Sequence, residues 1–192
     1  TSGNGNTAVG LNAMEHNTEG EGNTAIGYYS LKDNLEGEHN VAIGREALSR
    51  GVRPFGSVAI GMHANRENNW GSYNVAIGLS ALESNYDGHY NVASGYLSLQ
   101  SNIDGTFNTA LGGRTLERNE MGNFNVAVGG WGLEQNVGNH QSTAIGYSAM
   151  QYADNRVIGQ ITYNTAVGFE AMKGSAIPAN NTGRFNSSLG HS

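Results

Sequence analysis

The chain has 192 residues, a formal net charge of −6 at pH 7 and an isoelectric point near 5.4. This acidic balance argues against nucleic-acid binding, which needs a basic surface to displace counterions from phosphates. The absence of cysteine excludes a disulfide framework and a thiol nucleophile, and no apolar run approaches the roughly 20 residues of a membrane span.

A five-residue phrase returns along the whole sequence at a fixed interval. It reads Asn-Thr-Ala-Val-Gly at residues 6–10 and Asn-Val-Ala-Ile-Gly at residues 74–78. Its glycine recurs every 17 residues from Gly10 to Gly146, and then twice after 22 residues, at Gly168 and Gly190. A fixed period of this kind is the signature of a solenoid. We therefore predict an all-β fold, a parallel β-solenoid (β-roll or β-helix) of about eleven coils, one for each phrase.

The spacing also divides the chain into two parts. Residues 1–146 hold the regular 17-residue repeats, and residues 147–192 hold two widened 22-residue coils with longer loops that continue the same solenoid. Because Thr1 lies only a few residues before the first phrase, we expect the chain to be a piece of a longer protein.

Each repeat contains two apolar segments. In the phrase, Val75 and Ile77 point to one side and Ala76 to the other, as period-2 geometry requires. A second apolar pair, such as residues 81–82, predicts a second strand, so that a coil holds two strands of about five residues and two turns.

The recurrent alanine predicts a narrow interior, with alanine inside and the Thr/Val and Val/Ile/Leu positions outside. The outer stripe would be too large an apolar surface for a soluble monomer, which predicts burial between subunits. The opposite assignment, with Val and Ile inside, also satisfies the alternation and requires no partner.

Two other columns of residues recur with the same period. Stacked turn asparagines favour a structural role, since amides hydrogen-bond along the stack and tolerate left-handed turns. Stacked aromatic residues indicate either ring packing between coils or a platform for sugar rings. The asparagines are Asn17, Asn34, Asn68, Asn85, Asn102, Asn119 and Asn136, and the aromatic residues are Tyr73, Tyr90, Phe107, Phe124, Tyr163 and Phe185.

The phrase N-[TV]-A-[VI]-G-x-x-[AS]-L with its 17-residue period resembles the repeats of phage tail-fibre proteins, and of bacterial fibre proteins with a C-terminal intramolecular chaperone. Residues 57–61 are similar to the head repeat of trimeric autotransporter adhesins, whose heads are left-handed parallel β-rolls with somewhat shorter rows. The resemblance covers residues 4–190. It implies a homotrimeric fibre segment, on a virion or otherwise extracellular, that attaches to a host-surface glycan or protein receptor.

We accordingly expect no enzymatic activity, no cofactor, no nucleic-acid partner and no membrane insertion. Two alternatives remain open at this point. One is the head of a bacterial trimeric surface adhesin. The other is a tail spike that degrades polysaccharide, because a pair of carboxylates from two subunits leaves no local sequence motif.

Candidate binding residues lie where coils depart from the repeat. An arginine cluster near Arg66 predicts either a site for anionic glycans or ion pairs with neighbouring glutamates. Exposed tryptophans indicate a glycan or partner contact, or a packed cap. The two longer loops form either a binding surface on a rigid scaffold or a transition to another domain. These candidates are Arg45, Arg50 and Arg53; Trp70 and Trp131; and Tyr152, Asp154, Asn155, Arg156, Asn180 and Asn181.

Metal chemistry has little support in the sequence. The six histidines show no metal-ligand spacing. Glu19 and Glu36 occupy the same turn position in successive coils, as do Glu21 and Glu38. Stacked carboxylates of this kind either splay into solvent or hold a cation such as Ca²⁺ or an arginine side chain between them. We predict no metal site.

Overall fold

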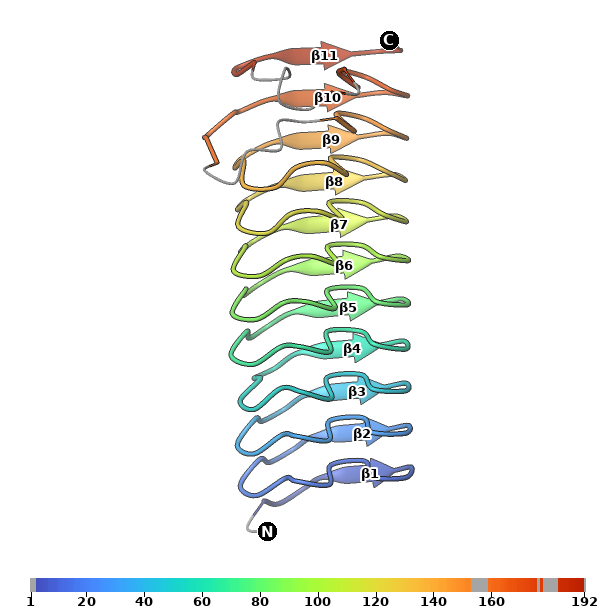
Figure 1. Cartoon of the computed structure of the whole chain (residues 1–192), viewed down its shortest axis with the longest axis vertical. Coiled ribbons are helices and arrows are strands. Elements are labelled where there is room, and N and C mark those ends of the chain that lie inside the picture. The colour runs from blue at the N-terminus through green and yellow to red at the C-terminus, as the bar shows by residue number, and fades with distance from the viewer. Residues whose placement is uncertain (1–2, 153–158, 176, 178–182, 192) are drawn as a thin grey trace.

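The computed structural model describes residues 3–152, 159–175, 177 and 183–191, and shows a single rod of stacked coils (Figure 1). Eleven parallel strands form one sheet, in which each strand pairs with the next along the chain. The predicted all-β solenoid is confirmed, and the described residues contain no helix. The strands are β1 (Thr7–Val9), β2 (Thr24–Ile26), β3 (Val41–Ile43), β4 (Val58–Ile60), β5 (Val75–Ile77), β6 (Val92–Ser94), β7 (Thr109–Leu111), β8 (Val126–Val128), β9 (Thr143–Ile145), β10 (Thr165–Val167) and β11 (Ser187–Leu189).

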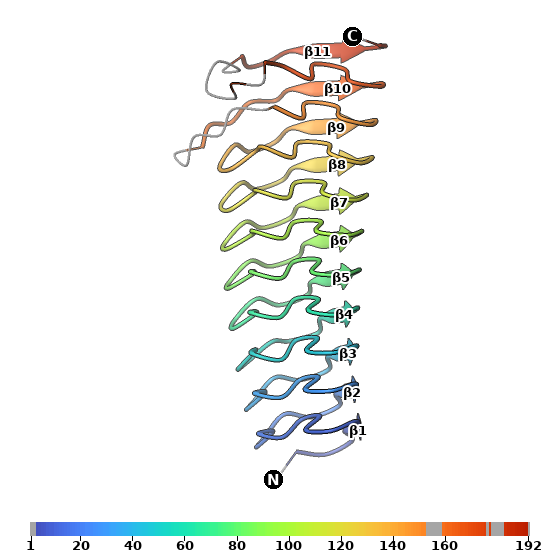
Figure 2. The ribbon, with the colours of Figure 1, turned by 45° about the vertical axis from the view of Figure 1, so that its right-hand side comes forward.

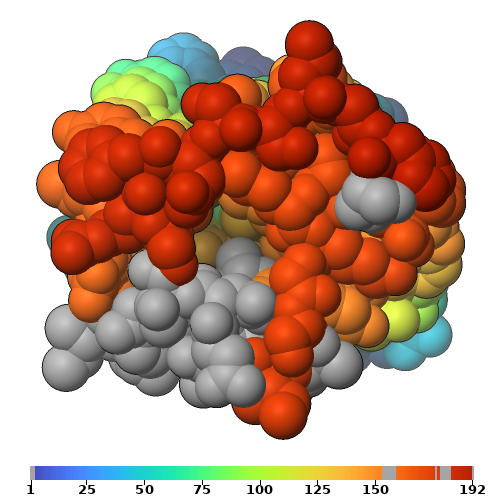
Figure 3. Space-filling model, turned by 90° about the horizontal axis from the view of Figure 1, so that it is seen from above, coloured from blue at the N-terminus to red at the C-terminus, as the bar shows by residue number. Residues whose placement is uncertain are grey.

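The coils repeat with little lateral displacement, and the two ends of the chain lie at opposite ends of the rod (Figures 1 and 2). Figure 3 looks along the rod from the C-terminal end, where the red atoms of the last coil lie over the orange atoms of the coils beneath it. Identical repeat positions are stacked, as in the pairing of Ala59 with Ala76 and of Ile60 with Ile77. A side chain in one coil therefore contacts its counterparts in the coils above and below.

Alanine faces the interior, as the first of the two assignments predicts. Ala76, the central residue of β5, is fully buried, whereas its neighbour Ile77 is 41% exposed. The same contrast holds along the sheet, where the central alanines from Ala25 to Ala166 are buried. The interior is narrow because the second apolar segment of each coil lies directly behind the strand, so only a methyl group fits there. The alternative with Val and Ile inside is wrong.

The second apolar segment is buried, but it is not a strand. Ala81 and Leu82 are fully buried, yet this part of the coil forms turns in which Ser80 and Leu82 have positive φ angles of 53°. Left-handed residues at alternate positions coil the backbone too tightly for an extended strand. The prediction of two five-residue strands per coil is therefore wrong, and each described coil has one strand of three residues.

Glycine closes each strand for a steric reason. Gly78 has a φ of 132°, and a Cβ atom there would lie 2.6 Å from the carbonyl oxygen of Gly95 in the next coil. Its N–H donates to the carbonyl of Ile60 at 2.8 Å. Any side chain would push adjacent coils apart, which accounts for the glycine at this position in every repeat.

Asparagine fills the polar part of the interior. Asn85 Nδ2 donates to Asn68 Oδ1 at 3.0 Å and to the carbonyl of Gly88 at 2.9 Å. The phrase asparagines form a parallel ladder, in which Asn91 Nδ2 donates to Asn74 Oδ1 at 3.2 Å. These side chains are fully buried, so the amides supply hydrogen bonds that water cannot reach. The structural interpretation of the turn asparagines is confirmed.

Candidate functional site

One exposed surface is the outer side of the sheet, which we call the strand face. It consists of the first and third residues of β1–β11, and none of these residues is charged. Ile26, Ile60, Ile77, Leu111 and Ile145 are all exposed on it. Monomeric proteins rarely expose a contiguous apolar surface of this extent. The predicted outward stripe of Val, Ile and Leu is therefore present along the sheet, with one interruption at Ser94 of β6.

An aromatic column borders the strand face, two residues before each strand. We call this position the leading column. The rings of Tyr73, Tyr90, Phe107 and Phe124 are stacked with centroid separations of 5.0, 4.8 and 5.2 Å and interplanar angles of 11°, 6° and 4°. Their neighbouring faces cover one another, and a sugar ring needs a free aromatic face. Ring packing between coils is confirmed for these four residues, which present their edges outward.

A second column borders the opposite edge, two residues after each strand. This trailing column comprises Leu11, Tyr28, Arg45, Met62, Leu79, Tyr96, Gly113, Gly130, Tyr147, Phe169 and His191. Seven of these positions are exposed apolar side chains, and Tyr147 stacks on Phe169 at 5.5 Å. This column was not predicted from the sequence. Its spacing of 17 and 22 residues is the signal by which it could have been recognised.

Each arginine of the predicted cluster has a carboxylate partner. Arg53 Nη2 lies 2.7 Å from Glu36 Oε1, and Arg50 Nη1 lies 2.8 Å from Glu67 Oε1. Arg45 Nε lies 3.2 Å from Glu46 Oε1. The interpretation as ion pairs fits this geometry better than an anionic-glycan site, because the partners already neutralise the guanidinium groups.

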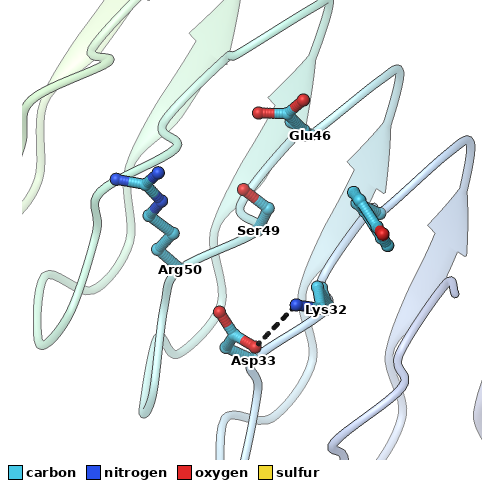
Figure 4. A pocket seen from close by; sticks show the side chains of 6 residues that line it. Lys32, Asp33, Glu46, Ser49 and Arg50 are labelled. Carbon is cyan, nitrogen blue, oxygen red and sulfur yellow. Dashed lines mark ion pairs between the residues drawn. The ribbon is translucent and has the colours of Figure 1, made fainter.

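A shallow depression is lined in part by residues of this cluster (Figure 4). Its volume is about 210 Å³, and Lys32 Nζ lies 3.8 Å from Asp33 Oδ1 within it. Ligand pockets for small molecules are usually larger and mainly apolar. This depression is a gap between paired charges, lined by Tyr29, Lys32, Asp33, Glu46, Ser49 and Arg50.

Trp70 belongs to an exposed apolar ridge at the turn between the second segment and the following strand. Its indole is 42% exposed, and the Arg53 guanidinium lies over it at 5.2 Å. We call this surface the turn ridge and define it as Leu35, Trp70, Tyr86, Ile103 and Met121, all exposed. Only Trp70 was singled out from the sequence. The five residues of the turn ridge differ in residue type and occupy two adjacent positions of the turn, so they do not form one column of similar residues.

The remaining candidates are not brought together. Trp131 packs edge-on against Tyr147 at 5.0 Å and 87°, which favours the interpretation as a packed residue. Tyr152 is half-buried in a turn, and its N–H donates to the carbonyl of Lys173 at 3.0 Å. The loop candidates Asp154, Asn155, Arg156, Asn180 and Asn181 lie outside the described residues.

Two groups with shifted pKa values make hydrogen bonds within a coil and between coils. Arg114 Nε lies 2.6 Å from Glu117 Oε2, and this hydrogen bond raises the pKa of Arg114. Burial lowers the pKa of His140, whose Nδ1 accepts the N–H of Asn123 at 2.9 Å. Within the described ranges, no three His, Asp or Glu side chains are grouped so as to hold a metal ion.

Comparison of the chain with protein-family models, with curated proteins and with solved structures finds no match. In the part of the chain that the structure describes, no helix is long and apolar enough to cross a membrane.

Proposed function

We propose that the chain is the structural and receptor-binding segment of a homotrimeric viral tail fibre that attaches to a host-cell surface. The observation that supports this most strongly is the strand face with its two bordering columns. An uncharged apolar surface running the length of a rod needs a partner of equal length and like chemistry, and another copy of the same chain supplies one. The resemblance of the repeat to those of trimeric fibre proteins implies three copies.

The size of the surface supports a stable assembly. Eleven coils at about 4.8 Å each give a length of about 50 Å, and seven residues of near-extended chain give a width of about 20 Å. The product, about 1,000 Å², is similar to the roughly 800 Å² that each partner buries in a stable protein interface. Assembly through this face leaves the turn ridge accessible to a receptor.

The turn ridge has the composition of a recognition surface. Trp, Tyr, Met and Arg are enriched at protein interfaces, and Trp70, Tyr86, Met121 and Arg53 bring all four types to the turns. Threefold display of such a site on a rigid rod strengthens weak binding to a glycan or protein receptor by avidity. In this proposal the fibre is located on the virion and therefore works outside the cell.

Light scattering on a sizing column tests the assembly. We expect a mass of three times 20.3 kDa, or about 61 kDa. Ile77→Asp and Ile103→Asp form a matched pair, since these side chains are 41% and 40% exposed in the strand face and the turn ridge. Ile77→Asp should shift the protein toward the monomer, because a carboxylate would be buried between subunits, whereas Ile103→Asp should leave the trimer intact. A monomeric wild-type chain, or dissociation by Ile103→Asp alone, contradicts the proposal.

A further inference from the structure

In five of the eleven coils, the two columns that border the strand face vary in size in a complementary way. The leading column has glycine at Gly5, Gly22 and Gly56, and the same coils have Leu11, Tyr28 and Met62 in the trailing column. The trailing column has glycine at Gly113 and Gly130, where the leading column has Phe107 and Phe124. Each of these coils thus has a large apolar side chain at one edge of the strand face and none at the other.

The glycine positions in the trailing column are open notches. A Cβ atom at Gly113 would meet nothing closer than the carbonyl oxygen of Tyr96 at 3.9 Å, and one at Gly130 nothing closer than Tyr147 Cδ2 at 3.7 Å. Because these glycines follow one another in adjacent coils, the notch is two coils tall.

A projection of the same height lies at the other edge of the same two coils. Phe107 and Phe124 are 49% and 52% exposed, and their stacked rings lie 5.2 Å apart. Stacking holds both rings in one orientation, so the pair forms a rigid apolar projection. Its height along the rod equals that of the notch.

We propose that the leading column of one copy lies against the trailing column of its neighbour at the same level, so that Phe107 and Phe124 occupy the notch at Gly113 and Gly130. This inference rests on the proposed homotrimer and adds the orientation and register of its subunits. Rotational symmetry about an axis parallel to the rod places these two edges in contact, coil against identical coil. A rotation axis that is not parallel to the rod, or an antiparallel arrangement of the two rods, does not align these edges in this way.

Shifted registers are disfavoured by the same side chains. A shift of two coils in one direction sets Phe107 and Phe124 against Tyr147 and Phe169, and a shift in the other direction sets them against Leu79 and Tyr96. In either shift the two rings lose the glycine notch and meet bulky side chains. Bulky residues also meet in the coils of β5, β6 and β10 of the unshifted register, so the preference for that register rests on the coils of β7 and β8.

One coil pairs polar residues with each other in the same register. The coil of β3 has His39 in the leading column and Arg45 in the trailing column, and both are exposed. Of the eleven coils it is the one with polar side chains in both columns. In the proposed register these two residues meet each other rather than apolar side chains, so neither loses its solvation to an apolar neighbour.

Engineered disulfides test the register directly, because the chain has no cysteine of its own. We would make the double variant Phe107→Cys/Gly113→Cys. Strand β7 and the residues that flank it separate these positions by on the order of 15 Å, and a disulfide requires Cα atoms within about 7 Å. A bond between them therefore joins two copies. Oxidation should give a covalent trimer that survives SDS without reductant.

Matched controls use the same chemistry. Phe107→Cys alone and Gly113→Cys alone should form no covalent product, since like edges do not meet. The pair Tyr90→Cys/Gly130→Cys lies two coils, about 10 Å, out of register and should also stay uncrosslinked. Circular dichroism confirms that each variant is folded.

Light scattering on the same samples distinguishes failure of the column pairing from failure of the homotrimer. A trimer that crosslinks only through positions 107 and 113 supports the column pairing. A trimer that crosslinks through the shifted pair, through single cysteines or not at all overturns the pairing and leaves the homotrimer standing. A monomer without crosslinks overturns both.

Discussion

Asn65 lies in the core at a position where the nine corresponding residues of other described coils are leucine or methionine. It is fully buried, and neither its Nδ2 nor its Oδ1 has a hydrogen-bond partner among the described residues. A buried polar atom without a partner costs about 1–3 kcal/mol. The backbone at Asn65 has a φ of 50°, close to the 53° of Leu82 in the next coil. Leucine therefore fits the conformation that Asn65 adopts.

We predict that Asn65→Leu stabilises the fold by about 1–3 kcal/mol, because it removes unpaired polar atoms and completes the leucine column. The melting temperature should rise accordingly. Asn68→Leu is the control, since Asn68 donates to Gly71 and accepts from Asn85, and it should lower the melting temperature. Loss of stability in Asn65→Leu would show that Asn65 has a partner worth more than the added apolar contact.

His140 makes stability depend on pH. Burial lowers its pKa in the folded state, and its neutral ring accepts the N–H of Asn123. In the unfolded chain the pKa returns to about 6.5, so the unfolded state binds the proton more readily as the pH falls. The stabilisation is fully present above pH 6.5 and is lost as the pH falls through the folded-state pKa.

The replacement His140→Asn tests this prediction, because Asn123 already uses its Oδ1 to accept the N–H of Thr106 at 2.6 Å one coil earlier. Urea denaturation at pH 7.5 and pH 5.5 should show a smaller loss of stability in the variant than in the wild type. Equal losses in the two proteins would rule out His140 as the titrating group.

At the scale of the repeat element, the glycine that ends each strand is the most restrictive position. Gly78→Ala combines a left-handed φ with a contact of 2.6 Å to the next coil, and should destabilise the fold by about 2–5 kcal/mol. Gly132→Ala places its Cβ at an ordinary distance of 3.5 Å from the Cβ of Ala127 and should change stability by about 1 kcal/mol or less. Thermal unfolding of the two variants checks the difference. A similar effect of both substitutions would contradict the steric explanation.

The same element shows what sequence could and could not predict. The strand and the column of aromatic residues follow from period-2 alternation and the 17-residue spacing, which fix the relative positions of side chains without reference to the rest of the coil. Alternation alone is satisfied with either Ala76 or its two neighbours inside, and the recurrence of alanine favours Ala76. The turn structure around Leu82 was missed because leucine has no intrinsic preference for a left-handed backbone. That conformation is held by contacts between coils, such as the bond from Leu82 N to the carbonyl of Ser98 at 2.9 Å.

The candidate sites were predicted less completely for a similar reason. The sequence indicates that Arg50 and Arg53 lie close together, but their pairing with Glu67 and Glu36 depends on side-chain orientation in adjacent coils. Tyr86 and Ile103 became part of a surface only when the turns were stacked. Periodicity identifies columns of residues, whereas a binding surface can combine several columns.

At the scale of the whole molecule, the hydrogen bonds that shape the coils run mainly between adjacent coils, to residues 16 or 18 positions away, as from Val75 N to the carbonyl of Asn91 and from Gly78 N to the carbonyl of Ile60, both at 2.8 Å. Among the described residues, the strand of each coil contacts only the strands of the coil before and the coil after. Unfolding should therefore begin at the two ends of an isolated chain. In the proposed trimer, the shared face would also protect the middle coils.

This arrangement of hydrogen bonds makes the rod mechanically anisotropic. Tension between the two ends of the chain loads the coil-to-coil contacts in series, so coils should peel away one after another. Each 17-residue step releases about 60 Å of chain and removes about 5 Å of rod height, giving extensions of about 55 Å in a single-molecule pulling experiment. A force applied across the rod loads all contacts at once and should meet far greater resistance. A fibre built from such coils would be stiff under force applied across its axis and would lengthen stepwise under steady tension along its axis.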